Sequence, residues 1–324
     1  RPNLTILSNA LAKRIRFEGR RAIGVEIERQ GKEEFHGGQE IIISAGASHS
    51  PALLMRSGIG PALHLRDMGI EVVADLAGVG QSLQDHPGIT TLAYLPSASR
   101  HGQNPGPAPQ VGARYSSGLE GCDPNDMYIS PIGRAVWHSV GRRLATMTTW
   151  VNKPYSRGQL RLRSADWREE PDVELNMLSD PRDLARMKLG MQRVAELFDQ
   201  APLKAATRDP FSTNFNRRAQ MVGAITLRNK FLTALASALI DGPGPLRRAV
   251  IDHVMLGRDV GKVLRQGDAA IEEHVMNHVV SIRHISCTCR MGREDDPLAV
   301  TGPDGRVHGI SSLRVADASV FPAV

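Results

Sequence analysis

Cysteine is scarce in this sequence, whose 324 residues contain only Cys122, Cys287 and Cys289. Three unevenly spaced cysteines cannot form the disulfide framework of a small secreted domain, so we expect a reducing compartment, with the cytoplasm as the default. Cys287 and Cys289 are one residue apart and could be half of a metal site. Because no second cysteine pair accompanies them, we expect no metal.

Aromatic residues and lysines are also few. Aromatic residues make up 4% of the sequence, and only 7 of the 40 basic residues are lysines. The net charge is +6, but the basic residues are scattered among 34 carboxylates and form no stripe. A protein that binds single-stranded nucleic acid needs aromatic stacking surfaces along a basic groove, so we expect no nucleic-acid partner.

Two longer signals are missing as well. No apolar run approaches the ~20 residues that a membrane-spanning helix needs, so no membrane span is expected. No Gly-x-Gly-x-x-Gly occurs, since Gly58-Ile-Gly60 and Gly78-Val-Gly80 both lack the third glycine. The phosphate-binding turn of a dinucleotide fold is therefore not in this sequence.

What is present is ordinary globular composition, 41% hydrophobic and 23% charged, on a chain long enough for a sizeable core and two domains. Runs of β-forming residues predict strands at 4–7, 22–27 and 40–44. After the third strand, Ser50 fits an N-cap and Pro51 the first position of a helix that Gly58 ends. Such a strand-turn-helix unit directs backbone N–H groups over the turn, which suits an anionic group.

The rest of the chain mixes both kinds of element. Residues 78–109 are rich in Gly, Pro, Ser and Gln and predict a domain crossing with a long loop. Alternating polarity predicts a strand at 159–163, and Asp180-Pro181 predicts the start of a helix with a core-facing apolar stripe. Further helices are expected at 231–240, 245–256 and 269–275, followed by an apolar, β-branched stretch at 279–291 and a buried strand at 313–317. The fold class predicted is mixed α/β.

Six blocks of the sequence form a recognisable series. They are GASHSPALLMRSGIG (46–60), GVGQSLQDHP (78–87), SRGQLRLRSAD (156–166), LSDPRDLARM (178–187), HISCTCRMG (284–292) and RVHGISSLRVADASVFP (306–322). These blocks resemble the glucose-methanol-choline (GMC) oxidoreductase family and follow one another in family order along nearly the whole chain. The first matches that family's second signature at every constrained position, which makes it far more specific than a short glycine motif.

The resemblance implies an FAD-binding domain of discontinuous segments, 1–88 and 277–324. A substrate domain with an antiparallel sheet and helices, 89–276, is inserted between them. The N-terminal Rossmann portion of the family fold is absent from these residues. FAD binding would therefore need an N-terminal segment supplied by the same or another chain. We predict that residues 1–324 alone bind FAD weakly or not at all.

His284 is the candidate catalytic residue. A lone histidine in an apolar stretch is more often a hydrogen-bonded core residue. The resemblance reverses that expectation, because relatives place a histidine that faces the flavin at this position. Oxidising an alcohol requires removal of the hydroxyl proton as hydride leaves the same carbon, and imidazole titrates near working pH. The resemblance therefore implies that His284 is a general base.

Three further residues are candidates for cofactor contact. In relatives, the strand at the position of Ala12 passes beside the adenine, although an ordinary strand residue fits the same position. Asp317 and Ala318 resemble the place where the family's backbone meets the flavin pyrophosphate and isoalloxazine. Asp317 also fits a cap on the following helix, and both interpretations can hold. His86 and His308 lie in matched blocks and are assigned to structure.

The sequence departs from the family pattern beside the candidate base. The family usually has His-Pro-x-Gly-Thr-Cys, whereas this chain has Ile285 for the proline and Cys287 for the glycine. The bulk of Cys287 is expected to narrow the space beside His284. Relatives pair this histidine with a second histidine or asparagine, which would lie beyond Val324.

Three functions remain open on the sequence. The first is FAD-dependent oxidation of a CH–OH group of a small-molecule alcohol, as an oxidase or a dehydrogenase. The second is a hydroxynitrile lyase, because the same family fold hosts that reaction. The third is a non-catalytic basic binding module. The alcohol itself is not specified, although the low aromatic content argues against a quaternary-ammonium cage.

Overall fold

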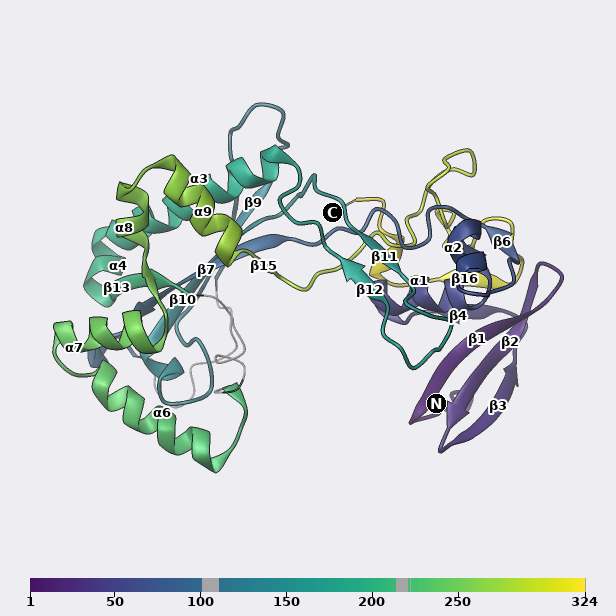
Figure 1. The fold of residues 1–324 in the computed structure, drawn as a ribbon, viewed down its shortest axis with the longest axis horizontal. Helices are drawn as coiled ribbons and strands as arrows, with labels where there is room; N and C mark the ends of the chain where they lie inside the picture. Colours follow the sequence, from purple (N-terminus) through teal and green to yellow (C-terminus); the bar gives the residue numbers. More distant parts are fainter. Residues whose placement is uncertain (101–110, 214–220, 222, 324) are drawn as a thin grey trace. The chain divides into compact units, whose positions relative to one another are not determined.

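The computed structural model describes residues 1–100, 111–213, 221 and 223–323, and Figure 1 shows the chain as a ribbon. Two compact units are each assembled from separate stretches of chain. Unit 1 comprises Arg1–Asp85, Ser156–Met177 and Arg283–Val324, and unit 2 comprises His86–Tyr155 and Leu178–Ile282. Helices and sheets occur together, as the predicted mixed class requires. The functional division into 1–88, 89–276 and 277–324 stays a prediction; the structure groups residues 156–177 with unit 1.

Unit 1 is built from small sheets around one long helix. β1, β2 and β3 form an antiparallel sheet in that order, β4 pairs in parallel with β16, β5 pairs in parallel with β6, and β11 pairs antiparallel with β12. The elements are β1 (Ala10–Glu18), β2 (Arg21–Arg29), β3 (Lys32–Gly37), β4 (Ile41–Ile43), α1 (Gly46–Arg56), β5 (Ile59–Gly60), α2 (Ala62–Asp67), β6 (Ala74–Asp75), β11 (Gln159–Arg161), β12 (Asp172–Glu174), β16 (Leu313–Val315) and the 3-10 helix η4 (Ala318–Val320).

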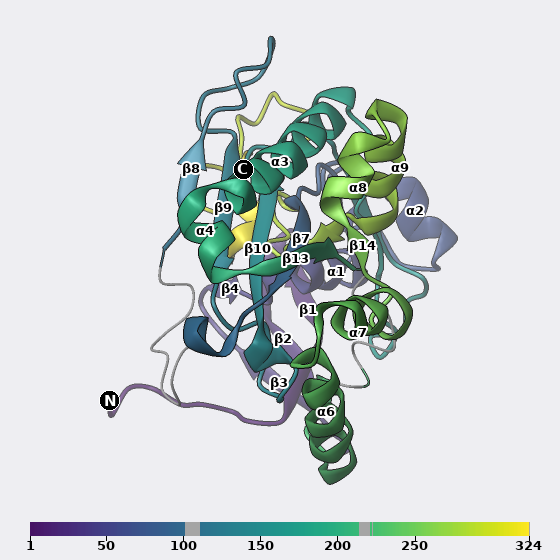
Figure 2. The same cartoon turned by 90° about the vertical axis from the view of Figure 1, so that its left-hand side faces the viewer.

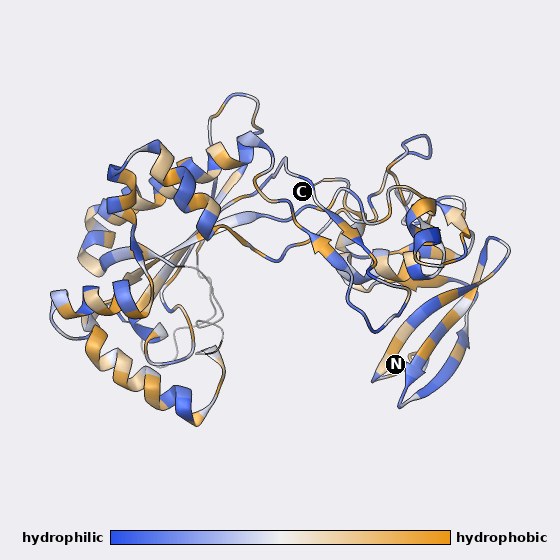
Figure 3. Cartoon of the chain, viewed as in Figure 1, coloured by the Kyte–Doolittle hydropathy of each residue, from blue (hydrophilic) through white to orange (hydrophobic). Residues whose placement is uncertain are grey.

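The three-stranded sheet follows from its turns. Gln30 and Gly31 both have positive φ, 52° and 76°, which is the two-residue turn that matches the twist of antiparallel strands. The first strand predicted, at 4–7, is wrong: β1 begins at Ala10, and Leu4 and Ile6 are exposed. β3 was not predicted, because its residues are mostly charged and polar, as Figure 3 shows.

The helix α1 begins four residues before the predicted N-cap, at Gly46, so Pro51 lies inside it. Proline cannot donate a backbone hydrogen bond, which leaves the carbonyl of Ala47 without its helical donor. The hydroxyl of Thr288 donates to that carbonyl at 2.6 Å instead. This substitute bond explains how a proline is tolerated one and a half turns into the helix.

The core of unit 1 lies between α1, the β4–β16 pair and the first sheet. Its largest fully buried side chains include Leu54, Met55 and Leu65. Burying each side chain of this size contributes about 1.5–3 kcal/mol. The predicted strands at 22–27, 40–44 and 313–317 are confirmed as β2, β4 and β16.

Unit 2 is a sheet in the order β14-β13-β7-β10-β9-β8, with β15 also paired to β7. Its helices α3, α8 and α9 contact one another, and α3 packs on β10 and β7 (Figure 2). The elements are β7 (Pro87–Tyr94), η1 (Ser97–Ser99), β8 (Ala113–Tyr115), β9 (Met127–Ile132), η2 (Gly141–Arg143), β10 (Leu144–Val151), α3 (Pro181–Asp199), α4 (Ala201–Ala206), β13 (Arg208–Ser212), α6 (Leu227–Ile240), α7 (Gly244–Ala249), the π-helical turn η3 (Val250–Val254), β14 (Arg258–Asp259), α8 (Val260–Arg265), α9 (Asp268–His278) and β15 (Val280–Ser281).

α3 confirms the predicted capped helix. The side chain of Asp180 accepts from the N–H of Arg182 at 2.9 Å, and Met187 and Met191 are buried against the sheet. Inside the unit, the fully buried guanidinium of Arg186 pairs with the carboxylates of Asp126 and Asp183. Buried charges need such partners, because an unpaired one is very costly.

One prediction for this part of the chain is wrong. The long loop expected at 78–109 contains β7, which lies between β13 and β10 in the sheet; residues 101–109 are outside the described residues. The apolar stretch at 279–291 forms a strand at Val280–Ser281 and isolated bridges at Ser286 and Met291. The helices expected at 231–240 and 269–275 are confirmed as α6 and α9.

Candidate functional site

His284 lies in an irregular segment of unit 1, and the residue is exposed. Two non-glycine residues with left-handed backbone flank it, Arg283 at φ 68° and Cys287 at φ 69°. Such conformations cost about 1–3 kcal/mol each and persist only where surrounding contacts enforce them. The contacts of this segment therefore decide how the imidazole is presented.

One side of the segment is held by the loop before β7. Gln84 and Ser286 form a bridge in which each N–H donates to the other carbonyl, at 3.2 and 3.0 Å. The carboxylate of Asp85 accepts from the N–H of His284 at 2.9 Å. The thiol of Cys287 donates to the side-chain oxygen of Gln84 at 3.3 Å.

The other side of the segment is held by the end of the chain. The N–H of Cys287 donates to the carbonyl of Ala318 at 3.1 Å, and the N–H of Cys289 donates to that of Ser319 at 2.8 Å. Of the residues singled out from the sequence, His284, Asp317 and Ala318 are thus brought into one bonded network. His284 and Asp317 are more than thirty positions apart in the sequence, and they come together because the chain returns alongside the His284 segment.

Asp317 serves as a cap for two helices. Its Oδ1 accepts from the N–H of Ser319 at 2.8 Å, which confirms the cap on the following turn. Its Oδ2 accepts from the N–H of Gly46 at 2.9 Å and from the hydroxyl of Ser50. The anionic group expected over the turn before α1 is therefore this carboxylate, placed where the helix dipole favours negative charge.

Ala12 lies apart from this network in β1, and it is exposed. β1 is an edge of the described three-stranded sheet, and its register against β2 shifts between Ala12 and Arg14. A bulged edge strand presents backbone groups that its own sheet does not use. A hydrogen bond joins β1 to the end of α1, because the N–H of Ile15 donates to the Ser57 hydroxyl at 2.8 Å.

The two neighbouring thiols are buried. Burial raises the pKa of Cys287 and that of Cys289, so both thiols stay protonated at neutral pH. Cys287 is fully buried, and its sulfur contacts Gln84 and Ser286. The Cys287 side chain is packed toward Gln84, to which its thiol is hydrogen-bonded.

Sequence reasoning missed Gln84, Asp85 and Thr288 as contacts of this network. The signal available was the matched block at 78–87, which contains the first two residues. Of that block, only His86 was considered, and it was assigned to structure. His86 and His308 do bond to backbone carbonyls, those of Val151 at 3.1 Å and Gly292 at 3.2 Å.

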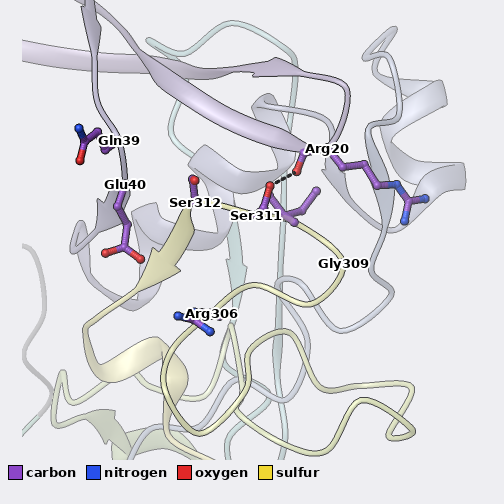
Figure 4. Close-up of a pocket in the computed structure, with 8 residues that line it drawn as sticks. Arg20, Gln39, Glu40, Arg306, Gly309, Ser311 and Ser312 are labelled. Carbon is purple, nitrogen blue, oxygen red and sulfur yellow. Dashed lines mark hydrogen bonds between the residues drawn. The ribbon is translucent and has the colours of Figure 1, made fainter.

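A surface pocket of 610 Å³ lies elsewhere in unit 1 (Figure 4). It is lined by Arg20, Gln39, Glu40, Arg306, Gly309, Ile310, Ser311 and Ser312. None of the four residues singled out from the sequence lines it. In the described part of the chain, no group of three or more His, Cys, Asp or Glu side chains is placed to hold a metal. No helix among the described residues is both long and apolar enough to cross a membrane.

Comparison with known proteins identifies the family. The N-terminal and C-terminal models of the GMC oxidoreductases match residues 1–88 and 154–324. The chain is 36% identical to 5-(hydroxymethyl)furfural oxidase of Methylovorus sp. (strain MP688), covering 100% of this chain and 54% of that protein. It is 33% identical to oxygen-dependent choline dehydrogenase of Rhizobium rhizogenes (strain K84), covering 100% and 55%. The chain thus spans about half the length of the curated relatives it matches.

Solved structures show the same fold. Pyridoxine 4-oxidase from Mesorbium loti superposes with a TM-score of 0.71 at 21% identity, covering 100% of this chain and 55% of that one. Formate oxidase superposes with a TM-score of 0.73 at 22% identity, covering 100% and 57%. FAD modification is described for formate oxidase of Aspergillus oryzae, and the GMC oxidoreductases bind FAD. From the two family models and the shared fold, this chain belongs to the GMC oxidoreductase family.

Proposed function

We propose that this chain carries the general base of an FAD-dependent oxidoreductase. The enzyme oxidises a CH–OH group of a small-molecule alcohol to the aldehyde or ketone, and His284 accepts the hydroxyl proton. The observation that carries the proposal is the exposed His284 on a backbone segment held from both sides. The names of the relatives support it, because hydroxymethylfurfural and choline are both alcohols.

The residues present fit part of a flavin site. Ala12 on its bulged edge strand offers backbone groups to a flat ring such as adenine. Asp317 and Ala318 are half-buried, and their backbone continues β16 beside the His284 segment. No Gly-x-Gly-x-x-Gly is present to hold the phosphates. In this proposal 1–88 and 277–324 belong to the FAD-binding domain, 89–276 to the substrate domain, and a further N-terminal segment completes the site.

The chemistry assigned to the chain's own residues is proton transfer and orientation. Bound flavin supplies the hydride acceptor that no side chain can provide. An imidazole nitrogen of His284 takes the hydroxyl proton, which makes the neighbouring carbon a better hydride donor. The segment's bonds to Asp85 and Ala318 hold the backbone from which the ring extends, so that less freedom is lost on reaching the transition state.

The test is substitution of His284 in the complete flavin-loaded enzyme. We expect His284→Ala to lower kcat/KM for alcohols by about 10²–10⁴-fold, the usual contribution of a general base. Flavin content is expected to be unchanged, because the side chain is not assigned to cofactor binding. His36→Asn is the matched control, since His36 lies on β3 and bonds to Glu34 of the same strand.

Two outcomes would contradict the proposal. One is His284→Ala with wild-type kcat/KM across the pH range. The other is cleavage of cyanohydrins without bleaching of the flavin spectrum, which would assign lyase chemistry to the same fold. Release of cyanide from a cyanohydrin, followed together with the flavin spectrum, measures the second outcome, and an anaerobic screen of alcohols for bleaching measures alcohol oxidation.

A further inference from the structure

The backbone that carries His284 is strained at two positions. Arg283 and Cys287 both adopt the left-handed region, where a residue with a Cβ is disfavoured. Left to itself, the 283–287 segment would relax toward ordinary backbone angles and the ring of His284 would turn with it. Something in the surroundings must hold the segment in place.

The backbone bridge between Gln84 and Ser286 holds the segment two residues beyond His284. At His284 itself, the carboxylate of Asp85 accepts the backbone N–H, with Oδ1 2.9 Å from the nitrogen. Asp85 is 5% exposed, so water competes little for this bond. A hydrogen bond from an N–H to a carboxylate is roughly twice as strong as one between neutral groups.

We propose that Asp85 is a positioning residue for the catalytic base. Its carboxylate holds the N–H of His284, keeps the strained 283–287 backbone from relaxing, and thereby fixes the direction of the Cα–Cβ bond from which the imidazole extends. This inference rests on the proposed function of His284, because a fixed direction matters only if the ring transfers a proton. Asp85 makes no direct contribution to the chemical step.

The test compares variants of Asp85 in the complete flavin-loaded enzyme. Removing a hydrogen bond to a charged group lowers a rate by about 10- to 100-fold when the bond is needed to reach the transition state. We expect Asp85→Ala to lower kcat by about this factor, with KM within about threefold of wild type. Asp85→Asn retains an acceptor oxygen at the same place, so most of the activity should return.

A second readout is independent of turnover. Amide hydrogen exchange of the peptide that covers 283–287, measured by mass spectrometry, should accelerate in Asp85→Ala and stay near wild type in Asp85→Asn. The matched control is Asp75→Ala. The Asp75 carboxylate also accepts one backbone N–H, that of Ala62 at 3.0 Å, and it lies outside the His284 network. This control should change neither kcat nor exchange at 283–287.

The outcomes separate this inference from the proposed function. If His284→Ala abolishes activity while Asp85→Ala keeps wild-type kcat and exchange, the positioning role is wrong and the function stands. If activity in Asp85→Ala falls only in proportion to lost flavin or lost folded protein, Asp85 is structural and the inference is overturned. If His284→Ala is fully active, the proposed function itself fails. Should Asp85→Ala not fold, Asp85→Ser supplies the same comparison with a shorter acceptor.

Discussion

Single residues in this chain often serve two elements at once. Asp317 caps η4 with one carboxylate oxygen and α1 with the other, joining segments more than two hundred positions apart. Thr288 supplies to α1 the hydrogen bond that Pro51 cannot donate. The chemistry proposed for His284 therefore depends on side chains whose first effect is to hold backbone in place.

A buried histidine in unit 2 predicts a pH dependence of stability. His274 on α9 bonds to the hydroxyl of Ser212, stacks on His278 at 3.8 Å between ring centroids, and feels the charge of Arg258. Burial, then the charges of His278 and Arg258, lowers the pKa of His274 from 6.5 to about 4. The native state therefore binds this proton less tightly than the unfolded state does.

As the pH falls from 6.5 toward 4, the unfolded state takes up the proton first and is favoured. This histidine then costs up to about 1.4 kcal/mol of stability for each pH unit in that window. His274→Gln should remove this part of the slope, measured as the free energy of unfolding in urea at pH 7.5, 5.5 and 4.5. His36→Gln is the control, and equal slopes for His274→Gln and wild type would contradict the assignment.

At the scale of elements, the loop that carries Gln84 and Asp85 depends on a glycine. Gly80 has φ +81°, and a Cβ placed on it would lie 2.3 Å from the carbonyl oxygen of Leu160. The loop approaches this closely because Leu160 donates its N–H to the carbonyl of Gly80 at 2.6 Å. The N–H of Gly80 in turn donates to the carbonyl of Thr288 at 2.8 Å.

Alanine at this position should therefore be far more damaging than its size suggests. Gly80→Ala is expected to cost about 1–2 kcal/mol for the left-handed backbone and a further ~1–3 kcal/mol for the contact. Gly69→Ala is the matched control, because Gly69 has φ +71° with nothing within 4 Å of a Cβ. Urea unfolding measures both, and equal losses would show that crowding at Leu160 is unimportant.

Elements with local signals were predictable from the sequence. The cap at Asp180 and the stripe of α3 are encoded within one helix, and β16 is a short apolar run. β7 was not predicted, although Ile89, Thr90 and Tyr94 are β-forming residues, because it lies within the longer Gly-, Pro- and Ser-rich stretch 78–109 and its neighbours β10 and β13 come later in the chain. The start of α1 was also misplaced, because the carboxylate that caps this helix belongs to Asp317, which is far away in the sequence.

The residues of the candidate site also divide into those that the sequence predicts and those that it does not. His284 and Asp317 could be named because they lie in long matched blocks. The role of Asp85 could not, because a carboxylate that binds a backbone N–H 199 positions away leaves no periodic signal. Strain at Arg283 and Cys287 is likewise a property of backbone angles, which residue type does not specify.

For the whole molecule, the expected weakness of flavin binding by residues 1–324 alone stays a prediction. The physical reason is that no glycine-rich turn is present to bind the phosphates. The purified 324-residue chain, incubated with FAD and desalted, should lose the flavin absorbance that the complete enzyme retains under the same protocol. A stable yellow sample at stoichiometric occupancy would overturn the prediction.

The order in which the two units receive their segments bears on how the chain folds during synthesis. The last stretch of unit 2 ends at Ile282, whereas unit 1 also needs the stretch that begins at Arg283. The ribosome therefore delivers everything unit 2 requires before it delivers β16, the Asp317 cap and His284. On the nascent chain, unit 1 must wait without the Asp317 cap on α1 and without β16 beside β4, so it is exposed to chaperones and proteases for longer than unit 2.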